Sequence, residues 1–291
     1  MKLATLSHRD EIFVASIGSD NATARPLSID GRRVADMQAL IEHASTSGKN
    51  WSEGEPIALD EATVLAPIPR PHRNVMCVGK NYYEHAHEFT KSGFDSSASS
   101  ASDAVPKAPI IFTKMPETVV GTHTKIGYPG NQSEQLDYEA ELGVVIGKAG
   151  QGIEPADAMG HVFGFVVIND LTARDLQAKH KQWFLGKSFE TSCPMGPWLV
   201  TADEVDSGNL QVQCWVNGEL RQDSNTRDLI FDIPTLIATL SRGMTLLPGD
   251  VIATGTPVGV GIGFTPPKFL QSGDKVEVEI TGLGRLSNTI R

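Results

Sequence analysis

The first 70 residues carry a hydrophobic pattern of their own. Residues 12–17 form a short apolar run, and residues 36–43 have the apolar spacing of a helix. Residues 65–71 contain three prolines, a composition typical of a linker. We therefore predict a small N-terminal domain over residues 1–70 and a larger domain over residues 71–291.

From residue 74 onward, turn residues separate short apolar runs, as expected for strands. The predicted strands cover Val75–Gly79, Ile110–Thr113, Leu136–Ile146, Val162–Asn169, Gly196–Val200, Leu210–Val216, Asp250–Thr254 and Lys275–Ile280. Helices are predicted over residues 81–91, after Thr172 and over Ile233–Ser241. Because strands and helices do not alternate regularly, we exclude a Rossmann fold and a βα-barrel. We expect a mainly β domain with some α, of the α+β class.

The helix predicted over residues 81–91 begins with Asn81 as its N-cap and carries Glu84 three residues later. Residues 92–106 then combine many Ser, Ala and Asp residues, a composition typical of a mobile loop. Together, this helix and loop are expected to form a movable lid.

The charge balance and the cysteine content exclude several classes of protein. The chain has 35 acidic and 25 basic residues, which argues against a nucleic-acid-binding protein but not against an anionic substrate. Its three cysteines, Cys77, Cys193 and Cys214, are too few and too widely spaced for a disulfide framework or a zinc knuckle. Residues 1–11 lack the apolar stretch of a signal peptide, and no run approaches the ~18 apolar residues of a membrane span. We expect a cytoplasmic protein with no membrane partner.

The predicted strand Leu136–Ile146 carries three acidic residues at every second position. Side chains alternate along a strand, so Asp137, Glu139 and Glu141 should share one face. The strand then continues as an apolar run, which indicates a buried end. Like charges on one face beside a buried run are unfavourable without a cation. An exposed edge face of acids explains this segment alone equally well.

A fourth carboxylate strengthens the interpretation as a metal site. Asp170 ends an apolar strand, and Thr172 with Asp175 three residues later predicts the start of a helix. Asp170 therefore lies at a strand-to-helix corner, where functional residues often occur. Glu139, Glu141 and Asp170 offer only hard oxygen ligands, which suit Mg²⁺, Mn²⁺ or Ca²⁺ much better than zinc.

Cationic and polar residues follow Asp170 along the chain. Arg174 and Gln177 are three residues apart and share a helix face, from which an arginine can grip a carboxylate with two hydrogen bonds. Ordinary solvated helix residues would show the same spacing. Lys187 lies among apolar residues, so it either extends to water or pairs with acids. Pairing with acids fits a site that holds three carboxylates.

A histidine and a glutamate in the predicted lid helix form a candidate catalytic pair. His85 and Glu88 are three residues apart and share a face, and a carboxylate beside histidine makes a general base. His87 and Glu84 are competing choices. A solvated polar helix would show the same residues.

Residues 247–261 contain several glycines but lack the Gly-Lys-Ser/Thr ending of a phosphate-binding P-loop. These glycines more plausibly allow tight turns or a close approach of backbone to a ligand. Thr256 in this run offers a hydroxyl or a backbone amide to such a ligand.

Taken together, these segments resemble the fumarylacetoacetate hydrolase family. The resemblance is strongest to its shorter members, such as the fumarylacetoacetate hydrolase domain-containing proteins and the bacterial acylpyruvate hydrolases. The resemblance spans residues 74–291 in the family's order. It is carried by residues 77–82 (CVGKNY), 137–147 (DYEAELGVVIG), 169–177 (NDLTARDLQ), 186–197 (GKSFETSCPMGP) and 248–261 (PGDVIATGTPVGVG).

The resemblance implies a rolled mixed β-sheet in the catalytic domain, a small N-terminal domain and a homodimer. It implies Mg²⁺ or Mn²⁺ on the three carboxylates and a lid pair, His85 and Glu88, that activates water. The residues that it assigns to the substrate are Lys187, which adds positive charge, and Arg174, Gln177 and Thr256. The clearest departure from the family is the insert over residues 92–106, beside the lid.

Our first hypothesis is hydrolytic cleavage of a C–C bond in a 2,4-dioxo acid, an acylpyruvate such as fumarylpyruvate, in aromatic or sugar-acid catabolism. The second is isomerisation or decarboxylation of a related unsaturated oxo-diacid, including oxaloacetate decarboxylation, on the same scaffold. Both use a small 2-oxo-carboxylate substrate. A third hypothesis is a non-catalytic metal- or ligand-binding protein, which the His–Glu pair disfavours because passive binding needs no base.

Overall fold

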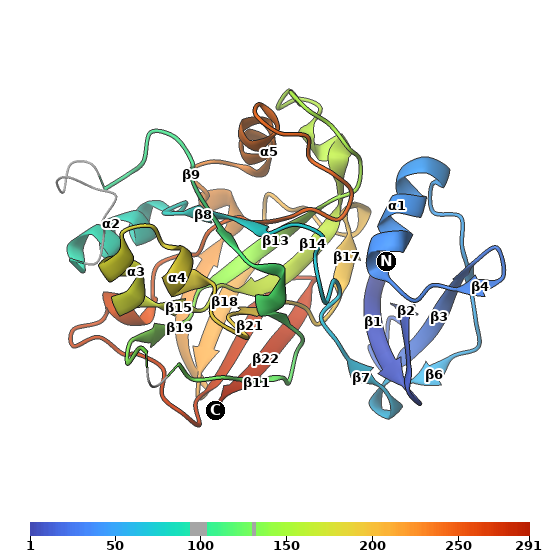
Figure 1. Cartoon of the computed structure of the whole chain (residues 1–291), viewed down its shortest axis with the longest axis horizontal. Coiled ribbons are helices and arrows are strands. Elements are labelled where there is room, and N and C mark those ends of the chain that lie inside the picture. Colours follow the sequence, from blue (N-terminus) through green and yellow to red (C-terminus); the bar gives the residue numbers. More distant parts are fainter. Residues whose placement is uncertain (94–103, 130–131) are drawn as a thin grey trace.

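The computed structural model describes residues 1–93, 104–129 and 132–291, and strands run through this whole length (Figure 1). The predicted α+β class is confirmed, because short helices lie around two large sheets. The predicted loop over residues 92–106 falls largely outside the described residues. All three cysteines are buried and free, as their spacing predicts. Among the described residues, no helix is long and apolar enough to cross a membrane.

The larger sheet has 13 strands and mixes parallel with antiparallel pairs. Its pairs are antiparallel except β20 with β8. The main path runs in the order β4 (Arg32–Arg33), β3 (Thr23–Ile29), β2 (Glu11–Ile17), β1 (Lys2–His8), β17 (Leu199–Thr201), β14 (Val162–Asn169), β13 (Ala140–Ile146), β20 (Val251–Ala253), β8 (Val75–Gly79) and β9 (Ile110–Lys114). Three short strands pair beside this path: β5 (Ser52–Glu53), β6 (Ile57–Ala58) and β7 (Thr63–Val64).

A second sheet of five strands packs against β13 and β14 of the first. Its order is β11 (Lys125–Ile126), β22 (Gly284–Ile290), β21 (Lys275–Ile280), β18 (Gln211–Val216) and β19 (Glu219–Asn225). Two further pairs join β10 (Val119–Val120) to β16 (Cys193–Pro194) and β12 (Leu136–Asp137) to β15 (Thr172–Ala173).

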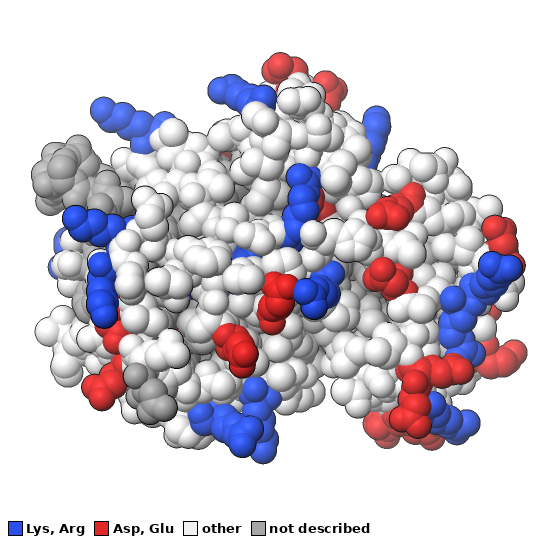
Figure 2. All heavy atoms as spheres, viewed as in Figure 1, with Lys and Arg blue, Asp and Glu red and all other residues white. Residues whose placement is uncertain are grey.

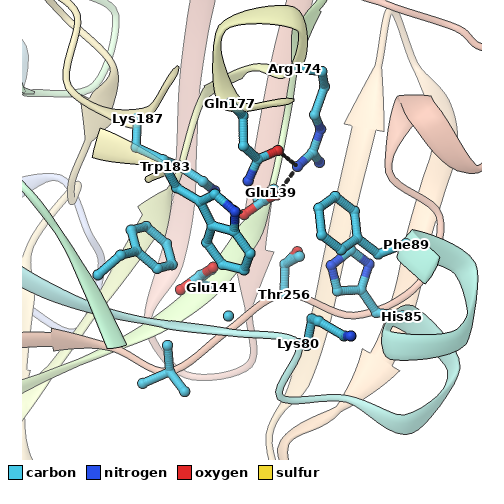
Figure 3. A pocket seen from close by; sticks show the side chains of 13 residues that line it. Lys80, His85, Phe89, Glu139, Glu141, Arg174, Gln177, Trp183, Lys187 and Thr256 are labelled. Carbon is cyan, nitrogen blue, oxygen red and sulfur yellow. Dashed lines mark hydrogen bonds and ion pairs between the residues drawn. The ribbon is translucent and has the colours of Figure 1, made fainter. Parts of the chain in front are cut away.

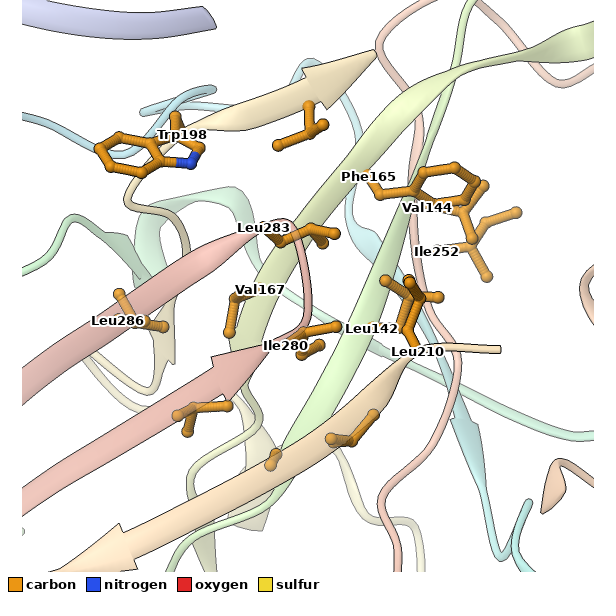
Figure 4. Packing of buried hydrophobic residues seen from close by; sticks show 14 of the residues in the cluster. Leu142, Val144, Phe165, Val167, Trp198, Leu210, Ile252, Ile280, Leu283 and Leu286 are labelled. Atoms are coloured by element: carbon orange, nitrogen blue, oxygen red, sulfur yellow. The ribbon is translucent and has the colours of Figure 1, made fainter. Parts of the chain in front are cut away.

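The main hydrophobic core fills the space between the two large sheets (Figure 4). Leu142 and Val144 of β13 enter this core, whereas Val145 enters a second core on the opposite face of the same strand. Because both faces of β13 are covered, its sequence from Leu142 to Ile146 is apolar without interruption rather than alternating. The face that carries Val145 also carries Glu141 two pleats earlier, which directs that carboxylate away from the main core.

Of the five α-helices in the described residues, three gather at one end of the molecule, on the left of Figure 1. These are α2 (Tyr83–Lys91), α3 (Arg174–His180) and α4 (Phe184–Lys187). The other two, α1 (Met37–Ser47) and α5 (Ile233–Ser241), lie apart from them, α1 over the N-terminal strands. On the face shown in Figure 2, acidic and basic side chains are interspersed.

The N-terminal strands are continuous with the rest of the larger sheet. Lys2 and Leu3 of β1 pair with Val200 and Leu199 of β17. The second core likewise combines Leu3 with apolar side chains of β14. The predicted boundary at residue 70 therefore separates two parts of one sheet, and it stays a prediction that these parts are domains.

The predicted strand Leu136–Ile146 is two strands, because the chain leaves the sheet at residues 138–139. Just before this break the Asp137 carboxylate accepts the backbone amides of Gly261 and Ile262 at 2.6 and 3.1 Å. Those partners lie more than 120 residues away, so strand periodicity could not reveal the break.

Two predicted helix caps are wrong. Thr172 lies in β15, and its hydroxyl donates to the Asp170 carbonyl, so α3 begins at Arg174 without a side-chain cap. The side-chain amide of Asn81 instead donates to the carbonyls of Phe231 and Thr254, so α2 also begins without a capping side chain. In both cases a polar side chain that suits a cap has a different partner.

The contact between β14 and β17 leaves no room for a side chain at Gly164. A Cβ atom there would lie 2.3 Å from the Val200 carbonyl oxygen, which is backbone and cannot rotate away. We expect Gly164→Ala to lower the free energy of unfolding by about 1–3 kcal/mol, the usual cost of overpacking. Denaturant unfolding checks this. Gly160→Ala is the control, since nothing lies within 4 Å of its Cβ, and equal losses for both variants would contradict the explanation.

Candidate active site

A small cavity lies where α2, α3 and α4 approach β8 and β13 (Figure 3). Seven of the nine predicted site residues line it: His85, Glu139, Glu141, Arg174, Gln177, Lys187 and Thr256. The remaining two are directly behind the lining, because Glu88 contacts His85 and Asp170 contacts Lys187. The fold thus brings together residues from five separate stretches of sequence.

The three carboxylates predicted to bind metal form one buried group. Glu139, Glu141 and Asp170 each offer an oxygen, and these oxygens lie within 4.8 Å of one another. The pairing of β13 with β14 aligns the strand ends that carry them, and the Asp170 amide donates to the Glu139 carbonyl at 2.9 Å. The predicted common face therefore holds for Glu139 and Glu141, whereas Asp137 lies outside the group.

The pKa values of Glu139 and Glu141 are shifted in opposite directions. Burial raises the pKa of Glu141 well above its usual value, and the neighbouring carboxylates Asp170 and Glu139 raise it further. Burial also works to raise the pKa of Glu139, but Lys187 and Arg174 outweigh it and lower the pKa to about 2. Glu141 is thus the carboxylate whose charge lacks compensation.

Lys187 pairs with acids, as predicted. Its ammonium nitrogen lies 2.7 Å from Glu139 Oε2 and 2.8 Å from Asp170 Oδ2, on a side chain that is almost fully buried. Burial works to lower the pKa of Lys187, but Asp170 and Glu139 outweigh it, so the pKa is raised and the group stays cationic.

Arg174 and Gln177 also face the site rather than solvent. Arg174 donates to Asp137 at 2.8 Å and to Gln177 at 3.2 Å, and its Nη1 lies 2.7 Å from Glu139 Oε1. Its Nη2 is buried and has no hydrogen-bond partner among the described residues. A buried guanidinium donor without a partner, in a residue that lines a cavity, is suited to an anionic ligand.

The sequence analysis missed one buried charged residue of the site, Lys114, and did not foresee the partner of another, Asp137. Lys114 is fully buried, lies 2.7 Å from Asp170 Oδ1, and donates to the backbone carbonyls of Leu171 and Lys187. Asp137 was noted for its position, but its partner Arg174 was not foreseen. The available indication of Lys114 was its position directly after the predicted strand, with only Thr113 between it and the apolar run Ile110–Phe112.

The buried charges favour a bound cation. Four carboxylates face three cationic side chains, so one carboxylate would lack a compensating charge if all were ionised, which agrees with the raised pKa of Glu141. The carboxylates are Asp137, Glu139, Glu141 and Asp170, and the cations are Lys114, Arg174 and Lys187. Three converging hard oxygen donors of this kind fit a divalent cation such as Mg²⁺, Mn²⁺ or Ca²⁺. The residues therefore suit the group that the sequence predicted.

The predicted lid pair is in contact. His85 Nδ1 lies 3.1 Å from Glu88 Oε2, and the second oxygen of Glu88 accepts the Gly259 amide at 3.0 Å. Because an ionised carboxylate only accepts, Nδ1 carries the proton and Nε2 is the basic nitrogen of a neutral His85. The competing residues His87 and Glu84 are both exposed.

Comparison with known proteins agrees with this site. Residues 74–291 match the model of the fumarylacetoacetate (FAA) hydrolase C-terminal family. The chain belongs to the fumarylacetoacetate hydrolase family. The predicted rolled mixed sheet is thereby confirmed as the fold of that family, and the protein is an enzyme of its superfamily.

Two similar family members are named oxaloacetate tautomerases. Oxaloacetate tautomerase YisK of Bacillus subtilis (strain 168) is 52% identical over 234 residues, which cover 80% of this chain and 74% of that protein. Human mitochondrial oxaloacetate tautomerase FAHD2A is 47% identical over 233 residues, covering 79% and 70%.

Solved structures of the family align over the whole chain. The fumarylacetoacetate hydrolase of Exiguobacterium antarcticum has a TM-score of 0.85 and 35% identity, covering 100% of this chain and 99% of that one. The 2-hydroxyhepta-2,4-diene-1,7-dioate isomerase of Mycobacterium marinum has a TM-score of 0.78 and 32% identity, covering 100% and 98%.

The metal-site prediction can be tested by thermal stability. Saturating Mn²⁺ should raise the melting temperature, since a ligand at a hundred times its Kd stabilises by about 2.7 kcal/mol. Glu141→Gln should lose most of this shift, because it removes a charged oxygen donor. The exposed Glu154→Gln is the control and should keep it. An undiminished shift in Glu141→Gln would show that Mn²⁺ binds elsewhere.

The lid contact depends on a glycine at residue 263. A Cβ atom there would lie 1.9 Å from Glu88 Oε1, so Gly263→Ala must displace the Glu88 side chain from His85 and Gly259. We expect turnover to fall by about a hundredfold, the scale for losing a general base, with Mn²⁺ affinity unchanged. Steady-state kinetics and Mn²⁺ titration check this. Wild-type turnover would contradict the proposed pairing.

Proposed function

We propose that this enzyme is a metal-dependent tautomerase that interconverts the enol and keto forms of a 2-oxo dicarboxylate, with oxaloacetate as the substrate. The observation that carries the proposal is one cavity that combines a three-carboxylate metal site with a histidine–glutamate base. The names of YisK and FAHD2A favour this activity, as an isomerase on the same scaffold, over the C–C hydrolysis that was our first hypothesis.

Substrate binding would use the positive side of the site. Glu139, Glu141 and Asp170 would hold Mg²⁺ or Mn²⁺, which when bound supplies a Lewis acid for the 2-oxo group. The unpartnered Nη2 of Arg174 would receive a substrate carboxylate. Lys187, held beside the acids by two contacts, would add positive charge where the enolate oxygen develops.

Proton exchange would use the lid. In the conversion of enol to ketone, the enol oxygen loses its proton and the adjacent C3 carbon gains one. His85 would exchange the C3 proton through Nε2, and Glu88 would stabilise the imidazolium that forms when His85 carries it. The burial of His85 limits competition from water.

Hydrolysis of an acylpyruvate is the second candidate function, supported by the same lid pair and by the likeness to the Exiguobacterium hydrolase. A base that exchanges a proton with carbon can also activate water, and both reactions pass through an enolate. The homodimer and the cytoplasmic location stay predictions.

The proposal predicts separate effects for the metal site and the lid. Wild-type protein with Mg²⁺ should speed the loss of the ultraviolet absorbance of enol-oxaloacetate, and Glu139→Ala should abolish this while the protein stays folded. His85→Ala should slow it by about a hundredfold or more, the usual scale for a general base. The exposed His87→Ala on the same helix is the matched control.

Product analysis distinguishes the two candidates. Pyruvate and a carboxylic acid released from an acylpyruvate, without enzyme-dependent tautomerisation of oxaloacetate, would identify the hydrolase instead. Damage from His87→Ala with a silent His85→Ala would refute the choice of base.

A further inference from the structure

Gln222 of β19 is a fully buried side chain that makes three hydrogen bonds at the back of the cavity. Its Oε1 accepts the Ala140 amide at 3.0 Å, between the two glutamates of the metal site. Its Nε2 donates to Thr256 Oγ1 and to the Pro257 carbonyl, both at 2.8 Å. No sequence pattern singled out this residue.

The neighbours of Gln222 determine which way its amide points. The Ala140 N–H can only donate and the Pro257 carbonyl can only accept. A flipped amide would set donor against donor and acceptor against acceptor, leaving buried groups unpaired at a cost of roughly 1–3 kcal/mol each. The NH₂ group of Gln222 is therefore the one that faces Thr256.

This orientation determines the role of the Thr256 hydroxyl. Because an N–H of Gln222 points at Thr256 Oγ1, that oxygen accepts, and its own proton must point elsewhere. Thr256 Oγ1 donates to no other group within the described residues, and the side chain lines the cavity at 2% exposure (Figure 3). The hydroxyl thus directs a donor toward whatever occupies the cavity.

We propose that Gln222 is a positioning residue that holds the Thr256 hydroxyl as a hydrogen-bond donor to an oxyanion of the substrate. The inference deepens the proposed function, because it assigns this donor to the 2-oxo-carboxylate that the site would bind. A tautomerase and a hydrolase both need such a donor, so the inference does not depend on which reaction follows.

The test is a double-mutant cycle on ligand binding rather than turnover. The probe is oxalate, whose adjacent oxygens resemble those of a 2-oxo-carboxylate, titrated calorimetrically into Mn²⁺-loaded protein. Thr256→Val removes the hydroxyl, and Gln222→Met removes the amide at nearly constant volume. Each should weaken oxalate binding by about tenfold or more, the scale of a hydrogen bond to a charged group.

The coupling between the two positions decides the result. In the Thr256→Val background, Gln222→Met should weaken oxalate binding little further, because the hydroxyl donor is already absent. In the Thr256→Ser background, which keeps a hydroxyl, Gln222→Met should still weaken oxalate binding. Equal losses in all three backgrounds would overturn the proposal, as would unchanged oxalate affinity in Thr256→Val. Mn²⁺ affinity should be unchanged throughout, and Gln213→Met in the neighbouring strand is the control.

A second variant covers the case in which Gln222→Met does not fold. Gln222→Glu keeps an acceptor for the Ala140 amide, but once ionised it accepts the Thr256 proton and reverses the hydrogen bond. Oxalate binding by this variant should weaken as the pH rises and the introduced carboxyl ionises, relative to wild-type protein at each pH. A pH profile equal to that of the wild type would overturn the proposal. Absence of tautomerase activity in wild-type protein would refute the proposed reaction alone.

Discussion

Four buried carboxylates held against three buried cations are the interaction on which the rest of the site depends. Each charge is costly to remove from water, and ion pairs within the fold offset most of that cost. Lys114 and Lys187 approach Asp170 from β9 and α4, and Arg174 bridges Asp137 and Glu139 from α3. These ion pairs hold the short helices α3 and α4 against the sheet. The negative charge that stays uncompensated makes the site receptive to a divalent cation.

Both large sheets contribute residues to the site around these buried charges. β13 and β14 supply the acids, whereas the second sheet contributes Gln222, which bonds both to the Ala140 amide and to Thr256. The glycine-rich segment after β20 is held by the Asp137 carboxylate, and it in turn receives Glu88 from the lid. Hydrogen bonds therefore connect the carboxylate group, the His85–Glu88 pair and the Thr256 hydroxyl through the glycine-rich segment and Gln222.

The same geometry accounts for the variety of activities named among family members. Hydrolysis and tautomerisation both require an anionic oxygen to be stabilised and a proton to be moved nearby. In the proposed function, a divalent cation held by the buried acids would serve the first requirement together with Lys187 and Arg174, and His85 with Glu88 would serve the second.

The sequence by itself determined the residues whose roles follow from local spacing. Period-two acids in Leu136–Ile146, Asp170 at a strand end and the i,i+3 pair of His85 and Glu88 were all identifiable, because neighbours in sequence share a strand or helix face. Only the tertiary structure decided the pairings across long separations: Lys114 with Asp170, Asp137 with the Gly261 amide, and Gln222 with Thr256. The predicted cap at Asn81 failed for the same reason, because its side chain bonds to the distant Thr254 carbonyl, whereas the Thr172 hydroxyl bonds locally to the Asp170 carbonyl. A buried polar group takes whichever partner folding brings within reach, and local propensity cannot name that partner.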